Sequence, residues 1–196
     1  GLLPPLAQLR HIQIVTALEQ AVRLDPDLEA AHRELAYLYG RQNHLDQALE
    51  HRRAEVRLSR RAGPRPGEAA EEWAHRLELL EKDTAKLEEL VREGRDRYAS
   101  ASRQAEGERL AQAHLALRLG LARQAADEVL LPYPADLLGA AGIELELELL
   151  LSLGRAEEVR AILSDEAVMA GKKGLPYCDL PPPKNLDGTA LSTVPY

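Results

Sequence analysis

The chain has 196 residues and a formal net charge of −7 at pH 7, which argues against whole-surface electrostatic binding of nucleic acid or anionic lipid. Its single cysteine excludes an internal disulfide and a cysteine-based metal site. No run of apolar residues approaches the roughly 18 that a membrane-spanning helix needs, so membrane insertion is not expected.

Leu, Ala, Glu and Arg dominate the composition, whereas Phe is absent and β-branched residues are scarce. Alanine and straight-chain residues lose little conformational freedom in a helix, and strands are enriched in β-branched residues. The composition therefore predicts an all-α fold. The first residues show no signal-peptide pattern, and we favour a cytoplasmic location, although the sequence does not determine the compartment.

Residues 1–59 carry small and aromatic residues at helical spacing. Leu35 and Ala36 are followed by Tyr39 and, in the next segment, by Ala48, while Pro26 stops helix propagation ahead of them. This pattern resembles the tetratricopeptide repeat (TPR) family, in which a helix, a tight turn and a second helix form one unit. The resemblance places Leu35 and Ala36 at close-packing positions, Tyr39 at the aromatic position and Ala48 at the small position of the second helix.

The same segment departs from the TPR pattern at two places. His32 stands where the family usually has Trp, and Asn43 replaces the glycine of the turn. Asn and Gly tolerate a left-handed backbone best. We therefore expect Asn43, Gly120 and Gly154 to mark the points where the chain reverses between antiparallel helices.

Residues 60–104 begin with a Pro- and Gly-rich break and continue as a charged helix. Its less polar residues recur at alternating spacings of four and three, which is a heptad seam: Trp73, Leu77, Leu80, Thr84, Leu87, Val91, Gly94 and Tyr98. Acidic residues precede basic ones by four positions, which supports a long helix at roughly 0.2–0.5 kcal/mol per pair. Because Thr84 and Gly94 weaken the seam, we expect it to pack on its own chain, with dimerisation as the alternative.

Residues 105–166 repeat at an offset of 34, the length of a TPR unit. This offset aligns Leu115 with Leu149 and Gly120 with Gly154, so two further TPR-like units are expected. Residues 143–149 alternate apolar and acidic side chains as a half-buried strand does, but they also fit a helical stripe, and we favour a helix.

Residues 167–196 are rich in proline and are expected to form an extended tail. A repeat array normally ends in a polar capping helix, so this tail is compatible with a native chain that extends further. The expected architecture is a short TPR-like solenoid of stacked antiparallel hairpins, with one long charged heptad-bearing helix and this tail.

The TPR resemblance also implies a binding surface. Members of the family bind extended peptides in the concave groove lined by the first helix of each pair, where Arg33, Tyr37 and Arg41 would form one stripe. An aromatic ring between two guanidinium groups suits an acidic or C-terminal carboxylate ligand. The alternative is an ordinary exposed helix face. The Lys and Asn pattern of the family's carboxylate clamp is not reproduced.

A local basic cluster is the second candidate site. Its guanidinium groups could hold an acidic peptide or a phosphate by bidentate contacts, and it comprises Arg52, Arg53, Arg57, Arg60 and Arg61. The alternative is a helix C-terminus that favours cations, followed by a solvated loop.

No motif for a nucleotide, a nucleophilic serine or a zinc-binding helix is present. Nothing in the spacing makes His32, His44 and His51 converge on a metal, and Cys178 has no recognisable activating partner. We therefore predict no catalytic residue, metal or cofactor. The sequence favours a non-enzymatic scaffold that binds a protein or peptide partner, with a self-associating structural or assembly subunit that uses the heptad helix as the alternative.

Overall fold

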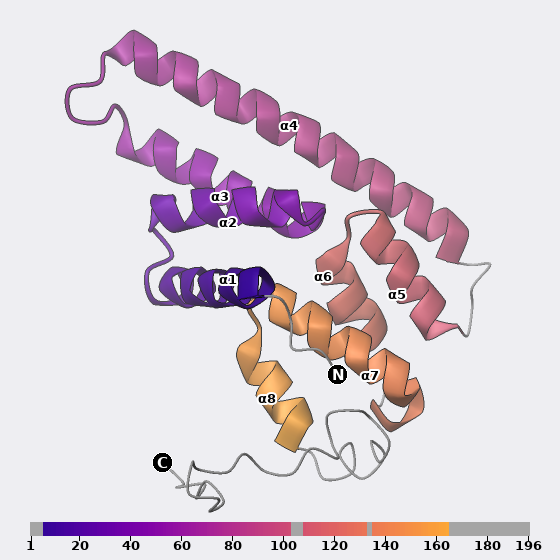
Figure 1. The fold of residues 1–196 in the computed structure, drawn as a ribbon. Helices are drawn as coiled ribbons and strands as arrows, with labels where there is room; N and C mark the ends of the chain where they lie inside the picture. The colour runs from indigo at the N-terminus through magenta and orange to yellow at the C-terminus, as the bar shows by residue number, and fades with distance from the viewer. Residues whose placement is uncertain (1–5, 103–107, 133–134, 165–196) are drawn as a thin grey trace, which may run out of the picture.

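The computed structural model describes residues 6–102, 108–132 and 135–164, and all regular structure in these ranges is helical (Figure 1). The predicted all-α class is confirmed there. The helices are α1 (Leu6–Leu24), α2 (Glu29–Arg41), α3 (Leu45–Ala62), α4 (Ala70–Ala101), α5 (Arg109–Arg118), α6 (Ala122–Gln124), the π-helical segment η2 (Ala125–Leu130), α7 (Ala135–Ser152) and α8 (Ala156–Ser164).

Two of the sequence predictions concern particular stretches of this chain. Residues 143–149 lie within α7, so the helix is confirmed and the strand alternative is wrong. The predicted tail over residues 167–196 lies outside the described residues. Within the described ranges, none of the helices combines the length and the apolar character that crossing a bilayer requires.

The first four helices pack in chain order. In Figure 1, α4 runs along one edge of the molecule, α3 and α2 lie beside it, and α1 follows. The later helices form a second group, in which η2 packs on α5 and α7 packs on η2. The two groups meet at three places, because α6 packs on α3, α7 packs on α1 and α5 packs on α4. The last long helix thus returns to the first.

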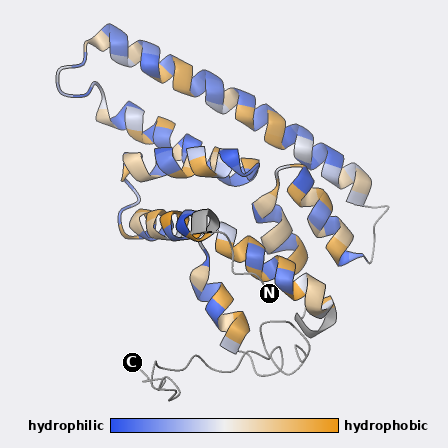
Figure 2. Ribbon diagram, in the orientation of Figure 1, coloured by the Kyte–Doolittle hydropathy of each residue, from blue (hydrophilic) through white to orange (hydrophobic). Residues whose placement is uncertain are grey.

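The heptad seam of α4 is packed on its own chain, as expected. Every one of its eight seam residues is buried or half-buried, and α4 contacts α3 and α5. Gly94 allows the closest approach, since a Cβ atom there would lie 2.9 Å from the carbonyl oxygen of Leu119. Hydrophilic residues cover most of the remaining surface of α4 (Figure 2).

Three helix-to-helix turns share one geometry. Asn43, Gly120 and Gly154 have φ values of 60°, 78° and 68°, so the predicted left-handed reversals are confirmed. In each turn, the residue after the left-handed one donates its N–H to the carbonyl five residues earlier, at 2.9 Å. This is the bond that closes a Schellman-type helix end, and it satisfies a carbonyl that the helix leaves open.

One continuous apolar core joins both groups of helices. Leu35, Ala36, Tyr39 and Ala48, which the sequence pattern singled out, are all buried. The core continues through α1 and α4 into α5, η2 and α7. Each Å² of apolar surface buried in this core stabilises the fold by roughly 25 cal/mol, and both groups of helices contribute to it. The core therefore holds the two groups in a fixed position relative to each other.

Candidate functional site

The predicted stripe on α2 lies on an exposed face. Tyr37 is 54% exposed, the Arg41 guanidinium lies 5.9 Å from the centroid of its ring, and Arg33 lies 3.9 Å from Glu29. The structure therefore brings Tyr37 and Arg41 together. None of the three predicted residues lines either of the two clefts described below.

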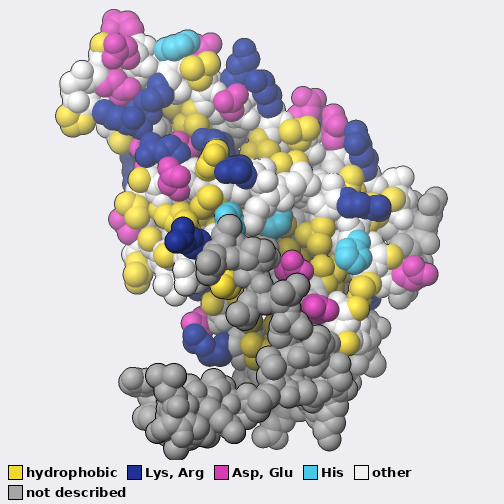
Figure 3. Space-filling view, in the orientation of Figure 1, with side chains coloured by type: hydrophobic (Ala, Val, Ile, Leu, Met, Phe, Trp, Pro, Cys, Tyr) yellow, Lys and Arg dark blue, Asp and Glu magenta, His cyan; other side chains and the backbone are white. Residues whose placement is uncertain are grey.

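Most of the predicted basic cluster is engaged in ion pairs within the chain. Four of its five arginines lie within 2.8 Å of a carboxylate oxygen, in the pairs Arg52–Glu55, Arg53–Glu88, Arg60–Glu81 and Arg61–Asp27. Arg57 has no such pair among the described residues, and it lines both clefts. Figure 3 shows acidic and basic side chains interspersed over the upper part of the molecule, where α4 lies.

Two adjoining clefts lie between the two groups of helices. The larger cleft has a volume of about 960 Å³ and is bounded by α3, α4, α6 and η2. The smaller cleft has a volume of about 400 Å³ and is bounded by α1, α2, α3 and the later helices. Both are lined by Glu50, Arg57, Arg123 and Asp127, so together they form one groove along α3.

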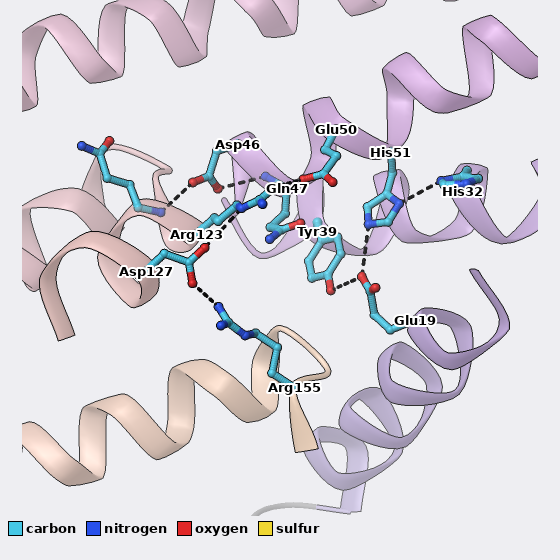
Figure 4. A network of polar contacts seen from close by, with 11 residues as sticks. Glu19, His32, Tyr39, Asp46, Gln47, Glu50, His51, Arg123, Asp127 and Arg155 are labelled. Carbon is cyan, nitrogen blue, oxygen red and sulfur yellow. Dashed lines mark hydrogen bonds and ion pairs between the residues drawn. The ribbon is translucent and has the colours of Figure 1, made fainter. Parts of the chain in front are cut away.

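A buried polar network forms one wall of the smaller cleft (Figure 4). Nδ1 of His32 lies 3.0 Å from Nδ1 of His51, and Nε2 of His51 lies 3.1 Å from Oε1 of Glu19. The hydroxyl of Tyr39 lies 2.7 Å from the same Glu19 oxygen and 3.1 Å from the carbonyl oxygen of Leu153. The network therefore joins α1, α2 and α3 to the turn that follows α7.

One hydrogen bond of this network has a defined direction. Nε2 of His32 lies 3.1 Å from the carbonyl oxygen of Pro26, which can only accept, so this nitrogen is the donor. A neutral His32 therefore accepts at Nδ1, and Nδ1 of His51 donates to it. The contact between Nε2 of His51 and Oε1 of Glu19 holds one further proton between the ring and the carboxyl group.

Burial and mutual contacts shift the pKa values of these groups. Burial opposes ionisation of Glu19, but the hydrogen bond and positive charge of His51 and the hydrogen bond of Tyr39 outweigh it, so the pKa of Glu19 is lowered. Burial lowers the pKa of His32, and the charges of His51 and Arg57 add to that effect. Burial and the Glu19 charge raise the pKa of Tyr39. These shifts favour a carboxylate at Glu19, a neutral imidazole at His32 and a phenol at Tyr39 at neutral pH.

The starts of α3 and α6 cap each other. The N–H groups of Leu45 and Asp46 donate to the carbonyl of Gly120 at 2.8 and 3.2 Å, and the Asp46 carboxylate accepts the N–H of Gln124 at 3.1 Å. Asp46 also accepts the N–H of Gln47 at 2.9 Å, and burial raises its pKa. Open N–H groups at each helix start are thus satisfied by the other segment.

Replacement of Asp46 by Ala should lower the free energy of unfolding by about 1–3 kcal/mol, because buried backbone donors lose their acceptor. Urea denaturation followed by circular dichroism measures the change. Asp83→Ala is the matched control, since Asp83 is an exposed carboxylate on α4 that only approaches Lys86; it should change stability by less than about 0.5 kcal/mol. Equal effects of the two substitutions would show that the reciprocal caps contribute nothing.

Arginines connect the second group of helices across the groove. Arg123 of α6 pairs with Glu50 of α3 and with Asp127 of η2. Arg155, at the turn before α8, pairs with Asp127 and Glu158. The π-helical segment carries Asp127 to the point where both arginines reach it (Figure 4). Glu50 and Asp127 are therefore already neutralised by neighbouring guanidinium groups.

The sequence did not predict the central site. His32 and His51 were considered as metal ligands, but the structure pairs them with each other and with Glu19. Within the described ranges, no three or more His, Cys, Asp or Glu side chains are grouped so that they could hold a metal ion. One signal was available: the TPR resemblance places His32 where the family usually has Trp, and a polar residue at a buried position needs a partner.

The chain has no match among the known proteins with which it was compared. It matches no model of a protein family, no curated protein and no solved structure.

Proposed function

We propose that this chain is a non-enzymatic scaffold, built on TPR-like helical hairpins, that binds an extended segment of a protein partner in the groove along α3. The observation that carries the proposal is the shared lining of the two clefts by Glu50, Arg57, Arg123 and Asp127. A small-molecule pocket is usually mostly apolar. This groove is long and largely charged, which suits the side chains and backbone of an extended polypeptide.

The TPR-like part of the proposal is supported by the repeated turn. Three helix ends each use one residue with a left-handed backbone and the same hydrogen bond, and two of them, at Gly120 and Gly154, are 34 residues apart. A hairpin that recurs at this period is typical of helical repeat proteins, whose stacked units leave an extended binding surface.

The proposed site differs from the one that the TPR resemblance implies. That resemblance places the ligand on α2, at Arg33, Tyr37 and Arg41, whereas the groove lies along α3. The α2 stripe therefore serves as the competing site in the test. Self-association through the heptad seam has less support, because the seam residues already pack against α3 and α5.

The proposal is tested by filling the groove. Ala85→Trp places an indole in the larger cleft, and Gln47→Trp places one in the smaller cleft. Ala74→Trp is the matched control, since Ala74 is exposed on α4 and lines neither cleft. Partners are captured from a lysate of the source organism by the full chain, identified by quantitative mass spectrometry, and then titrated in purified form against each variant.

We expect a partner whose Kd rises about tenfold or more with either groove variant and is unchanged with Ala74→Trp, which corresponds to a loss of about 1.4 kcal/mol. Arg33→Glu and Arg41→Glu report on the α2 stripe in the same titrations. A partner that is lost with these two variants and kept by the groove variants would move the site to α2. Equal recovery of all partners by every variant would overturn the scaffold proposal at both sites.

A further inference from the structure

We propose that the smaller cleft recognises an acidic segment of the partner, whose side-chain carboxylates bind Arg23 and Arg57. This inference rests on the proposed function and names the chemistry of the ligand. It starts from the charges that line the smaller cleft.

The carboxylates of the smaller cleft are already engaged. Glu19 contacts Nε2 of His51 and the hydroxyl of Tyr39, Glu50 pairs with Arg123, and Asp127 pairs with Arg123 and Arg155. None of these acidic groups is therefore left to balance a further cation at the cleft.

Two arginines of the same cleft have no such partner. Across the described residues, no carboxylate oxygen lies within 4.0 Å of a guanidinium nitrogen of Arg23 or Arg57. Other arginines of α3, namely Arg52, Arg53, Arg60 and Arg61, are all paired. Arg23 and Arg57 are thus the two unpaired arginines among the four that line the smaller cleft.

The two free guanidinium groups come from different helices that bound the same cleft. Arg23 belongs to the last turn of α1, and Arg57 belongs to α3. Each acts on the buried network behind the cleft, because the charge of Arg23 lowers the pKa of Glu19 and the charge of Arg57 lowers that of His32. Both arginines therefore contribute positive electrostatic potential to the smaller cleft, whose volume is about 400 Å³.

Carboxylates are the ligands that this arrangement fits best. A guanidinium group presents a planar fork of donors that matches a carboxylate in bidentate geometry. The net charge of −7 repels polyanions in general, so an acidic segment gains affinity where it reaches unpaired arginines such as these two. Arg57 also lines the larger cleft, which gives the segment a continuous path into the rest of the groove.

The test uses the full chain and a fluorescein-labelled octaglutamate peptide with an amidated C-terminus. Fluorescence anisotropy is measured at about 100 mM salt, where the Debye length is about 10 Å and distant charges are screened. Octaglutamine supplies the same peptide without charge, and an oligothymidylate of equal charge supplies an anion without carboxylates. The double variant Arg23→Gln/Arg57→Gln is compared with Arg60→Gln/Arg97→Gln, which removes the same charge from paired arginines outside both clefts.

We expect octaglutamate to bind, octaglutamine not to bind, and the Kd for octaglutamate to rise about tenfold or more in the cleft double variant but less than about twofold in the control. The inference is overturned if octaglutamate does not bind, if both double variants weaken it equally, or if oligothymidylate binds as tightly. A partner whose capture is blocked by Ala85→Trp but unchanged by Arg23→Gln/Arg57→Gln would refute this inference alone and leave the proposed function standing.

Discussion

Gly120→Ala is expected to lower the free energy of unfolding by about 2–5 kcal/mol. The residue has a φ of 78°, where an L side chain is strained by about 1–2 kcal/mol. A Cβ atom there would also lie 2.6 Å from Cγ of Leu45, and overpacking of this kind costs about 1–3 kcal/mol. Leu45 cannot retreat freely, because its N–H holds the carbonyl of Gly120 at 2.8 Å.

Urea denaturation followed by circular dichroism measures this loss, and Gly40→Ala is the matched control. Gly40 lies within α2 and has no positive φ, and a Cβ atom added to it would meet no neighbouring group within 4 Å. Alanine is favoured over glycine in a helix, so the control should gain about 0.5–1 kcal/mol. A loss of similar size in both variants, or no loss at Gly120, would contradict the contact between the two helix turns.

The second large effect is expected for Glu19→Ala, which should cost about 1.5–3 kcal/mol at pH 7, the range for losing buried hydrogen bonds to a charged group. The Glu19 side chain is only 17% exposed, and its removal leaves Nε2 of His51 without its partner and the Tyr39 hydroxyl with only the carbonyl oxygen of Leu153. Glu93→Ala is the control, since Glu93 forms an exposed pair with Arg97 and should cost about 0–1 kcal/mol.

The same contribution should depend on pH in a defined direction. Because the pKa of folded Glu19 is lowered, its contribution is present above the unfolded value of 4.5 and is lost as the pH falls below it. The free energy of unfolding of the wild type starts to fall at a higher pH than this, because of two buried histidines. Burial lowers the pKa of His32, and it lowers the pKa of His44 to about 4. The stability that each neutral histidine contributes is therefore lost as the pH falls below the unfolded value of 6.5. Unfolding measured between pH 7.5 and 3.5 should therefore show the difference between wild type and Glu19→Ala shrinking at the acidic end. A difference that stays constant over this range would refute an ionised Glu19 in the folded protein.

The parts of the fold that follow from local rules were predictable from the sequence. The left-handed turns at Asn43, Gly120 and Gly154 follow from the residues that tolerate this backbone, and α4 follows from heptad spacing. Even the alternating residues 143–149 could be assigned to a helix, because they continue a helical stripe.

The candidate site was not predictable in the same way, because it depends on contacts between residues far apart in the chain. Asp46 and Gln124 are separated by 78 positions, and Tyr39 and Leu153 by 114. The spacing of apolar residues along the chain does not predict pairs at such separations. The α4 surface shows the same limit on a smaller scale: Glu93 pairs with Arg97 as its spacing predicts, but Glu88 pairs with Arg53 of α3. A carboxylate on α4 can pair with an arginine of the same helix or with one of a neighbouring helix, and the sequence alone does not predict which of the two it contacts.

The reciprocal capping of α3 and α6 has a consequence for a chain that is cut. If the backbone were cleaved between α4 and α5, each fragment would carry a helix start whose N–H or carbonyl groups the other fragment satisfies in the intact protein. These hydrogen bonds would thus favour reassociation of the fragments in the native arrangement, in addition to the apolar core that they share. The two fragments would therefore be expected to reassemble by fragment complementation.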